Sequence, residues 1–288
     1  MILVTGATGH LGNDVVHHLL KKIPASEIAA LARDTTRLTA LKEKGVEIRP
    51  GDYNDYDSLV KAFSGIDKLY FVASNDIPNR MQQHINVVNA AKEANVKHVV
   101  FTSFQRRRDS GTPIAFISDV YLETESRLKQ SGITYTLMKH GLYADVLPFF
   151  LGDSIPEDGI FTLPAGDGKV SFALRSDMGE AGAHVLTTTG HDNKTYEISG
   201  NTAFSIADVA SILSGLAGRE IRYVSPTPEA FRQQRIQAGL PPEIAAMVTS
   251  FGEAINEREF DFPDTTLETF LGRKPTPLKD YLKTVYGL

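Results

Sequence analysis

The sequence predicts an α/β fold, in which a doubly wound parallel sheet is joined to a smaller, mostly helical C-terminal lobe. Two observations predict it. Up to residue 140, short apolar runs alternate with helical patterns, an order typical of a parallel sheet covered by helices on both faces. After residue 140, proline and glycine become frequent and this alternation stops. We therefore expect one domain over residues 1–140 and a smaller substrate lobe over 141–288, some segments of which return to the main sheet.

The short apolar runs of the first domain are the expected strands, because runs of this length bounded by turn residues suit a buried sheet. They lie at 1–5, 28–32, 46–49, 68–72, 98–102 and 135–138. The segments between them show helical patterns, and we expect helices at 13–22, 36–44, 56–63, 80–94 and 119–130.

The smaller lobe has fewer clear patterns. Strands are expected at 170–174 and 195–198, and a helix is expected at 205–216. This helix begins with Ser205, and Asp208 follows three residues later, which is typical of a capping box. Residues 226–288 are expected to be mostly helical, with breaks at prolines.

The turn after the first strand carries Gly6, Gly9 and Gly12, directly before the first helix. The first glycine permits a tight turn, the second leaves no side chain where a diphosphate must approach the backbone, and the third lets helix and strand pack closely. The start of the helix offers free N–H groups and a positive dipole end to phosphates. This context predicts a Rossmann-type domain that binds NAD(P), although an ordinary structural turn is the alternative. The candidate contacts are Gly6, Thr8, Gly9, His10, Leu11 and Gly12.

The residue after the second strand indicates which dinucleotide binds. NAD-specific domains usually place Asp or Glu there to bind the ribose hydroxyls, whereas this chain has Arg33. An arginine pairs with a 2′-phosphate through two parallel hydrogen bonds, so Arg33 favours NADP(H), with Arg37 as a second candidate contact. A solvated arginine is the alternative, and Asp34, one residue later, keeps NAD(H) open.

Three further strand ends supply candidate cofactor contacts, because ligands of open α/β sheets bind beyond the carboxyl ends of the strands. Asp52 follows the third strand and is expected near the adenine amine. The small residues Ala73 and Ser74 follow the fourth strand, where the chain passes beneath the diphosphate and the nicotinamide ribose. Ser103 follows the fifth strand, near the expected nicotinamide.

Composition and charge exclude several classes of protein. The 288 residues carry a formal net charge of −5, which argues against a nucleic-acid-binding surface, since such a surface needs a basic patch. The chain has no cysteine, so it holds no disulfide, thiolate metal site or cysteine nucleophile, and no metal is expected. No apolar run approaches the roughly 20 residues that span a bilayer. With an apolar strand at the first residues, no signal peptide is expected, and the expected location is the cytoplasm.

Several of these segments resemble the NmrA-like group of atypical short-chain dehydrogenases. They are Gly6 to Gly12, Arg33, Gly51-Asp52, Phe101-Thr102-Ser103 and Thr124-Glu125, and segments 170–177 and 271–276 are similar too. Within that group the chain is most similar to the NADPH-dependent quinone oxidoreductases. The resemblance implies a Rossmann-type fold, NADP(H) as cofactor, and a quinone or similar small molecule as acceptor.

One departure from the ordinary short-chain dehydrogenases bears on mechanism. Those enzymes carry Tyr-x-x-x-Lys after the fifth strand, where the lysine lowers the pKa of the tyrosine that protonates the substrate. Here Glu125 stands at the lysine position relative to Tyr121, and a neighbouring carboxylate raises the pKa of a tyrosine. The resembled quinone reductases usually carry His where Tyr121 stands. Tyr121 is therefore a candidate pocket residue or a packed helix aromatic, and no residue is assigned as catalytic.

The loss of a strong acid suits quinone reduction. Hydride addition to a ketone gives a very basic alkoxide, whereas addition to a quinone gives a hydroquinone anion with a pKa of roughly 10, which takes its proton from water. The protein must then position nicotinamide against quinone in an apolar, aromatic pocket. The candidate walls are Phe71, Phe104, Tyr121, Tyr143 and Phe149. His140 either steadies a substrate oxygen or is a solvated or hydrogen-bonded loop residue.

We therefore expect an NADPH-dependent oxidoreductase that reduces quinones or similar electrophilic acceptors by hydride transfer. The alternative is a regulatory protein that senses NADP(H) without turnover, and the absent lysine disfavours an isomerase or epimerase. Arg106, Arg107 and Arg108 are expected to form a solvated loop, with gathering of the acidic cofactor as the alternative. A homodimer is expected only as the commonest assembly.

Overall fold

The computed structural model describes residues 1–107, 112, 114–152, 154–155 and 158–288. Its centre is a seven-stranded sheet in the order β3-β2-β1-β4-β5-β6-β9, and every pairing in that sheet is parallel. The strands are β1 (Ile2–Val4), β2 (Ile28–Ala32), β3 (Glu47–Pro50), β4 (Lys68–Phe71), β5 (His98–Phe104), β6 (Thr134–His140) and β9 (Lys194–Ile198). The strand order reverses between β1 and β4, so the predicted doubly wound parallel sheet is confirmed.

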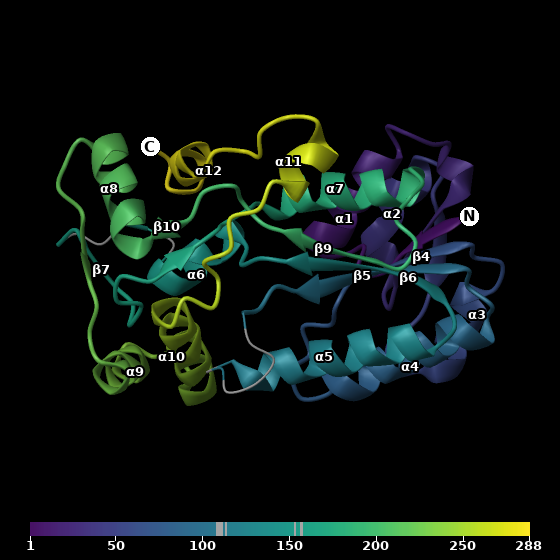
Figure 1. Cartoon of the computed structure of the whole chain (residues 1–288), viewed down its shortest axis with the longest axis horizontal. Coiled ribbons are helices and arrows are strands. Elements are labelled where there is room, and N and C mark those ends of the chain that lie inside the picture. The colour runs from purple at the N-terminus through teal and green to yellow at the C-terminus, as the bar shows by residue number, and fades with distance from the viewer. Residues whose placement is uncertain (108–111, 113, 153, 156–157) are drawn as a thin grey trace.

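Helices cover both faces of this sheet (Figure 1). On one face lie α1 (His10–Leu19), α2 (Thr39–Glu43), α7 (Arg175–Thr187) and α11 (Thr266–Leu271). On the other face lie α3 (Tyr56–Phe63), α4 (Arg80–Glu93) and α5 (Ala115–Gln130). Because both faces of the sheet are buried, the central strands are nearly continuous apolar runs, which is why they stand out in the sequence.

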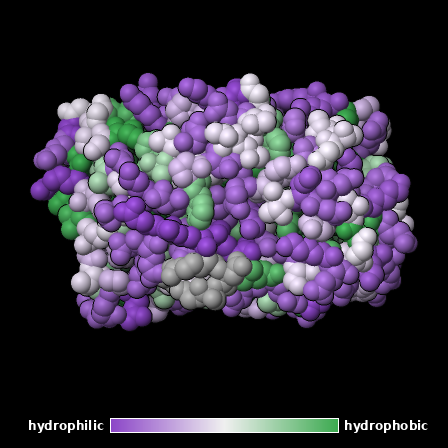
Figure 2. Space-filling model, viewed as in Figure 1, coloured by the Kyte–Doolittle hydropathy of each residue, from purple (hydrophilic) through white to green (hydrophobic). Residues whose placement is uncertain are grey.

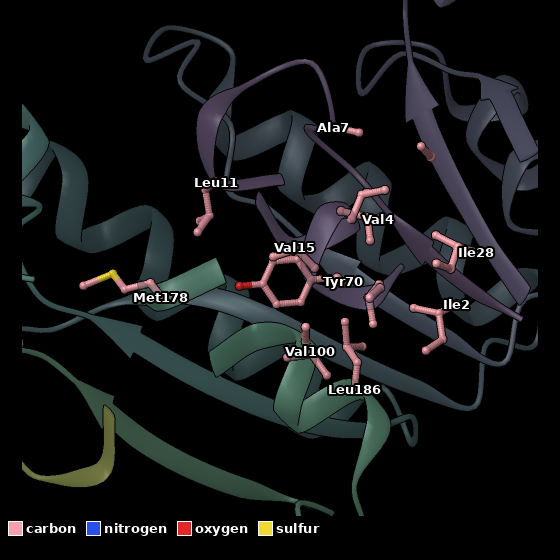
Figure 3. Packing of buried hydrophobic residues seen from close by; sticks show 14 of the residues in the cluster. Ile2, Val4, Ala7, Leu11, Val15, Ile28, Tyr70, Val100, Met178 and Leu186 are labelled. Carbon is pink, nitrogen blue, oxygen red and sulfur yellow. The ribbon is translucent and has the colours of Figure 1, made fainter. Parts of the chain in front are cut away.

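Tyr70 lies at the centre of the layer between the sheet and helices α1 and α7. Its ring packs among apolar side chains of strands and helices, including Val15 and Val100 (Figure 3). Helix α7 carries Gly182 where it passes this ring, and a Cβ at that position would lie only 2.7 Å from the Tyr70 hydroxyl oxygen. The glycine therefore allows α7 to pack closely on the sheet.

The remaining elements form a smaller lobe at the carboxyl ends of the main strands (Figure 1). Its short strands pair as β7 (Ile160–Thr162) with β11 (Arg222–Val224) and β8 (Lys169–Val170) with β10 (Phe204–Ser205). Its helices are α6 (Leu147–Leu151), α8 (Ile206–Ala217), α9 (Pro228–Gln237), α10 (Pro242–Asn256) and α12 (Leu278–Val285). A separate apolar cluster that includes Phe161, Phe231 and Phe260 holds the lobe together.

The structure confirms one expected detail of this region, the capping box, and corrects another, the strand at 170–174. Helix α8 begins with the predicted capping box, in which Ser205 and Asp208 each bind the other's backbone N–H. The strand expected at 170–174 is wrong, because β8 ends at Val170. Beyond it the backbone bonds to loops instead: the Ser171 N–H donates to the Phe260 carbonyl, and the Ala173 carbonyl accepts from the Ala144 N–H.

Two helices of the main domain begin earlier than expected. Helix α1 starts at His10 rather than at 13, and α5 starts at Ala115 rather than at 119. Helix α7 and strand β9 lie beyond residue 140 in the sequence, yet both belong to the main layers.

No helix among the described residues is long and apolar enough to cross a membrane. The face shown in Figure 2 is mainly hydrophilic, and its apolar residues lie in small groups.

Candidate active site

The glycine turn after β1 forms a cradle at the start of α1. Gly6 has a φ of +62°, a backbone conformation that residues other than glycine rarely adopt. A Cβ on Gly12 would lie 2.4 Å from the Gly6 carbonyl oxygen, so this position needs glycine for the helix to approach the turn. Gly9 is exposed, and a Cβ there would meet only the Gly6 oxygen at 3.4 Å. The cradle is therefore closed toward the protein and open toward solvent at Gly9.

The first turn of α1 lacks its own cap. Gly9 is the N-cap residue, no side chain caps the helix, and the first turn carries no acidic residue. The opening N–H groups are thus available to an anion, which fits the diphosphate of a dinucleotide. Around them, Thr8 is half-buried, His10 is exposed, and Leu11 is buried in the core, so Leu11 can offer a ligand only its backbone.

A cleft of about 950 Å³ runs between the edge strand β3 and helix α3, and its lining includes Arg33, which follows β2, and Asp52. Arg33 is exposed, and its guanidinium has no hydrogen-bond or ion-pair partner among the described residues. Asp52 accepts a hydrogen bond from the Asn54 N–H at 3.0 Å. Arg37, also exposed, follows within the next turn. Arg33 and Asp52 therefore lie at one cleft, beyond the ends of neighbouring strands.

Asp34 is committed to a local structural role. Its carboxylate accepts hydrogen bonds from the N–H and the hydroxyl of Thr36, and these bonds lower the pKa of Asp34. They make Asp34 the N-cap of the short helix that follows β2. This role weakens the case for Asp34 as a ribose ligand and leaves Arg33 as the free charged side chain at the end of β2.

The chain beyond β4 is held in place by side chains from neighbouring elements. The Ala73 N–H donates to the Thr102 hydroxyl at 2.8 Å, and the Ser74 N–H donates to His84 Nε2 at 3.0 Å. The Ser74 hydroxyl in turn donates to Gln83 Oε1. These bonds fix the floor on which the middle of a bound dinucleotide would lie.

His84 is a site residue that the sequence reasoning missed. It is 1% exposed, and burial together with nearby Arg80 lowers its pKa to about 3, so the ring is neutral. Because Nε2 accepts from Ser74, Nδ1 carries the hydrogen and donates to the Thr124 hydroxyl at 2.9 Å. The only sequence signal was a histidine on the apolar side of a helix, which is too common a pattern to single out.

Ser103 and Arg106 meet at Glu125 inside the protein. The Arg106 guanidinium donates to both carboxylate oxygens of Glu125 at 2.9 Å, and the Ser103 hydroxyl donates to Oε1. The interpretation of Arg106 as a solvated loop residue is therefore wrong. Arg107 is exposed, with its N–H bonded to Glu259, and Arg108 lies outside the described residues.

Aromatic side chains gather where β5 and β6 end. Phe104 and His140, the last residues of these strands, are register partners. Phe104 stacks on Tyr121 of α5 with ring centroids 5.5 Å apart, and His140 Nδ1 lies 3.2 Å from the Tyr143 hydroxyl oxygen. The structure thus brings together the four candidate pocket residues Phe104, Tyr121, His140 and Tyr143.

Two expected pocket walls lie elsewhere, and His140 differs from its expected setting. Phe71 is fully buried in the core layer against Phe101 and cannot line a pocket, so that prediction is wrong. Phe149 is 52% exposed on α6. His140 is not a solvated loop residue, because it ends β6 at 1% exposure. Burial lowers its pKa to about 3, so its ring is neutral.

Comparison with known proteins identifies the family of the chain. The model of the NmrA-like family matches residues 1–284. This chain belongs to the NmrA-like family. It is 33% identical over 288 residues to quinone oxidoreductase 2 of Escherichia coli (strain K12), covering 100% of this chain and 99% of that protein. It is 35% identical over 247 residues to the NAD(P)H azoreductase of Xenophilus azovorans, covering 85% and 84%.

Solved structures of related proteins share the fold of this NmrA-like chain. The NADPH-dependent quinone oxidoreductase of Escherichia coli complexed with NADPH matches with a TM-score of 0.93 and 33% identity, covering 99% of each chain. The Citrobacter sp. triphenylmethane reductase complexed with NADP(H) matches with a TM-score of 0.92 and 36% identity, covering 99% of this chain and 100% of that one. The expected Rossmann-type fold and the family resemblance are therefore confirmed.

In this NmrA-like protein, Tyr121 is poorly suited to donate a proton. Burial raises its pKa, while Arg80, whose guanidinium carbon lies 5.9 Å from the ring centroid, lowers it. The predicted direction is correct but the predicted cause is wrong, because the Glu125 charge is balanced by Arg106. Tyr121 also has no lysine at the expected position to activate it.

Proposed function

We propose that the protein is an NADPH-dependent oxidoreductase that reduces quinones or similar electrophilic acceptors by hydride transfer. The relatives support it, since they are named as a quinone oxidoreductase, an azoreductase and a triphenylmethane reductase. Quinones, azo compounds and triphenylmethane dyes are conjugated and electron-poor. Quinones and the cationic dyes can accept a hydride without first taking a proton at a strongly basic atom.

The proposed cofactor site joins the glycine cradle to the β3–α3 cleft at Arg33 and Asp52. The free N–H groups at the start of α1 would hold the diphosphate, and Arg33 would pair with the 2′-phosphate. Asp52 is the proposed adenine contact, and the fixed chain at Ala73 and Ser74 is the floor. NADPH, when bound, supplies the hydride. NADH can occupy the same cradle, but it has no 2′-phosphate for Arg33 to bind.

The observation that carries this proposal is the cluster of aromatic side chains at the ends of β5 and β6, which has no activated acid. Phe104 and Tyr121 form a stacked apolar wall against which a flat acceptor can lie. The tyrosine has a raised pKa, and the carboxylate at the lysine position is held in a buried ion pair. The protein therefore binds and orients the acceptor and excludes water, and the hydroquinone anion takes its proton from solvent after it leaves.

The test is NADPH oxidation by the purified protein with a panel of benzoquinones and naphthoquinones. We expect saturable oxidation that depends on the acceptor and is faster with NADPH than with NADH. Cofactor binding in the same sample without any oxidation would contradict the proposal and favour the alternative, a regulatory NADP(H) sensor. A cytoplasmic location, a homodimer and the absence of a nucleic-acid partner stay predictions from the sequence.

A further inference from the structure

Tyr143 occupies a distinct place among the pocket residues. It follows β6 directly, and its backbone bridges to Ala173, so its position is set by two segments. Its side chain packs against the core cluster that contains Leu11, in the first turn of α1. It also lies near enough to Tyr121 for that phenol to affect its pKa. Tyr143 therefore packs on the cluster beside the cofactor cradle and contacts His140, the register partner of Phe104, which is where the proposed function places the acceptor.

The Tyr143 hydroxyl is hydrogen-bonded to the buried His140. His140 Nδ1 lies 3.2 Å from its oxygen, and His140 Nε2 is buried without a hydrogen-bond partner. If Nε2 carried the hydrogen, a buried N–H would be left without an acceptor, which proteins tolerate less well than an unused lone pair. We therefore assign the tautomer with hydrogen on Nδ1, which donates to the Tyr143 oxygen. The hydroxyl hydrogen of Tyr143 is then free to point into the pocket.

A cation also lies over the Tyr143 ring. The Arg175 guanidinium carbon is 5.1 Å from the Tyr143 ring centroid, and the backbone N–H of Arg175 donates to Asp145 Oδ2 at 3.0 Å. Burial raises the pKa of Tyr143, and Arg175 partly offsets this rise. The hydroxyl thus keeps its proton at neutral pH, so it is a hydrogen-bond donor and not a proton source.

We propose that the Tyr143 hydroxyl donates a hydrogen bond to a carbonyl oxygen of the acceptor, and that His140 is the positioning residue that orients this hydroxyl. This inference rests on the proposed function. In the reaction, the hydride carries two electrons and one hydrogen to the quinone, NADPH becomes NADP⁺, and negative charge develops on a quinone oxygen. The Tyr143 hydrogen bond stabilises that charge, and water later supplies the proton that completes the hydroquinone.

The test compares an acceptor with a carbonyl oxygen to one without it. We would measure kcat/KM of the full-length protein with saturating NADPH for 1,4-benzoquinone and for crystal violet, a cationic triphenylmethane dye with no carbonyl. Tyr143→Phe is expected to lower the quinone value by about ten- to hundredfold, because a hydrogen bond to a charged oxygen is lost. The loss with the dye should be smaller by about tenfold or more. Tyr56→Phe, on the distant α3 surface, is the matched control and should change neither value.

Equal losses with both acceptors would overturn the inference, because they would indicate a general packing role for Tyr143. If the wild-type protein does not reduce the dye, the dissociation constant of NADPH replaces the dye as the reference. The inference then requires the loss in quinone kcat/KM to exceed any change in that constant by about tenfold. A wild-type protein that shows no NADPH oxidation with any of the quinones would contradict the proposed function itself, which is a separate result.

His140 variants test the positioning role. His140→Asn keeps an N–H near the Nδ1 position, whereas His140→Leu removes it at similar apolar volume. We expect His140→Leu to show part of the quinone-specific loss of Tyr143→Phe and His140→Asn to restore most of it. Equal quinone activity in the folded Asn and Leu variants would contradict a positioning role, and if His140→Leu fails to fold, the Tyr143→Phe comparison still decides the main inference.

Discussion

Glu125 and Arg106 form a bidentate ion pair inside the protein, with both N···O distances at 2.9 Å and side chains only 6% and 3% exposed. Glu125 stands where ordinary short-chain dehydrogenases carry the lysine that activates their tyrosine. In this chain the position serves structure, because it anchors Arg106 and the Ser103 hydroxyl beneath the site. A lysine placed there would face the Arg106 cation, so the proton-donating pair cannot be restored by a single substitution.

This pair predicts a strong effect on stability. Glu125→Ala should lower the free energy of unfolding by about 3–5 kcal/mol, because it leaves the buried Arg106 charge unpaired. Glu123→Ala on the same helix is the control: its ion pair with Arg127 is 40% exposed on both sides and should contribute about 1 kcal/mol or less. Denaturant unfolding of both variants measures the difference. Similar losses for the two variants would refute the importance of the buried pair.

Arg33 predicts the cofactor preference. Arg33→Ala should weaken NADPH binding by about ten- to hundredfold and NADH binding much less, since only NADPH offers a 2′-phosphate to the guanidinium. Arg222→Ala, an exposed arginine of the smaller lobe, should change neither affinity. Titration calorimetry gives both dissociation constants. Equal losses for NADPH and NADH would rule out the 2′-phosphate assignment.

Substitutions at Gly12 and Gly9 should have different effects, one on stability and the other on cofactor binding. A Cβ on Gly12 would lie 2.4 Å from backbone, so Gly12→Ala should destabilise the fold by about 2 kcal/mol or more. A Cβ on Gly9 meets only one atom, at 3.4 Å, so Gly9→Val should fold but lose binding of both NADPH and NADH. Thermal unfolding and cofactor titration separate these effects. A Gly9→Val protein that binds either dinucleotide normally would contradict the cradle.

His84 predicts a loss of stability in acid. Burial lowers its pKa from 6.5 to about 3, so the unfolded chain binds the proton more readily than the folded one. The stability due to neutral His84 is therefore complete above pH 6.5 and falls as the pH drops toward 3. In His84→Gln this slope should be shallower by up to about 1.4 kcal/mol per pH unit. Unfolding free energies measured across this range test it, and identical slopes would show that His84 does not titrate as described.

The main sheet and the cradle could be predicted from sequence because their signals are local. Strands buried on both faces are apolar runs. Gly6 is required by its own positive φ, and Gly12 by the neighbouring backbone of Thr5 and Gly6. The glycine spacing, together with the strand before it and the helix after it, was therefore sufficient to predict the cradle.

The rest depended on contacts between distant segments. Arg106 was taken for a solvated residue because its partner, Glu125, lies on the next helix rather than beside it in the chain. Phe71 and His84 pack against each other with ring centroids 5.0 Å apart, a contact that neither position reveals in sequence. The strand expected at 170–174 failed because the hydrogen bonds of Ser171 and Ala173 go to loops from other parts of the chain.

The most direct test of the proposed chemistry is an anaerobic measurement of stoichiometry with purified protein, NADPH and a limiting amount of 1,4-benzoquinone. Hydride transfer moves two electrons in one step, so one NADPH should be consumed and one hydroquinone formed for each quinone added. Without the protein or without the quinone, NADPH should be consumed no faster than in the uncatalysed reaction. Saturation of the protein with NADPH, with no hydroquinone formed above that rate, would contradict hydride transfer to quinones as the function of this chain.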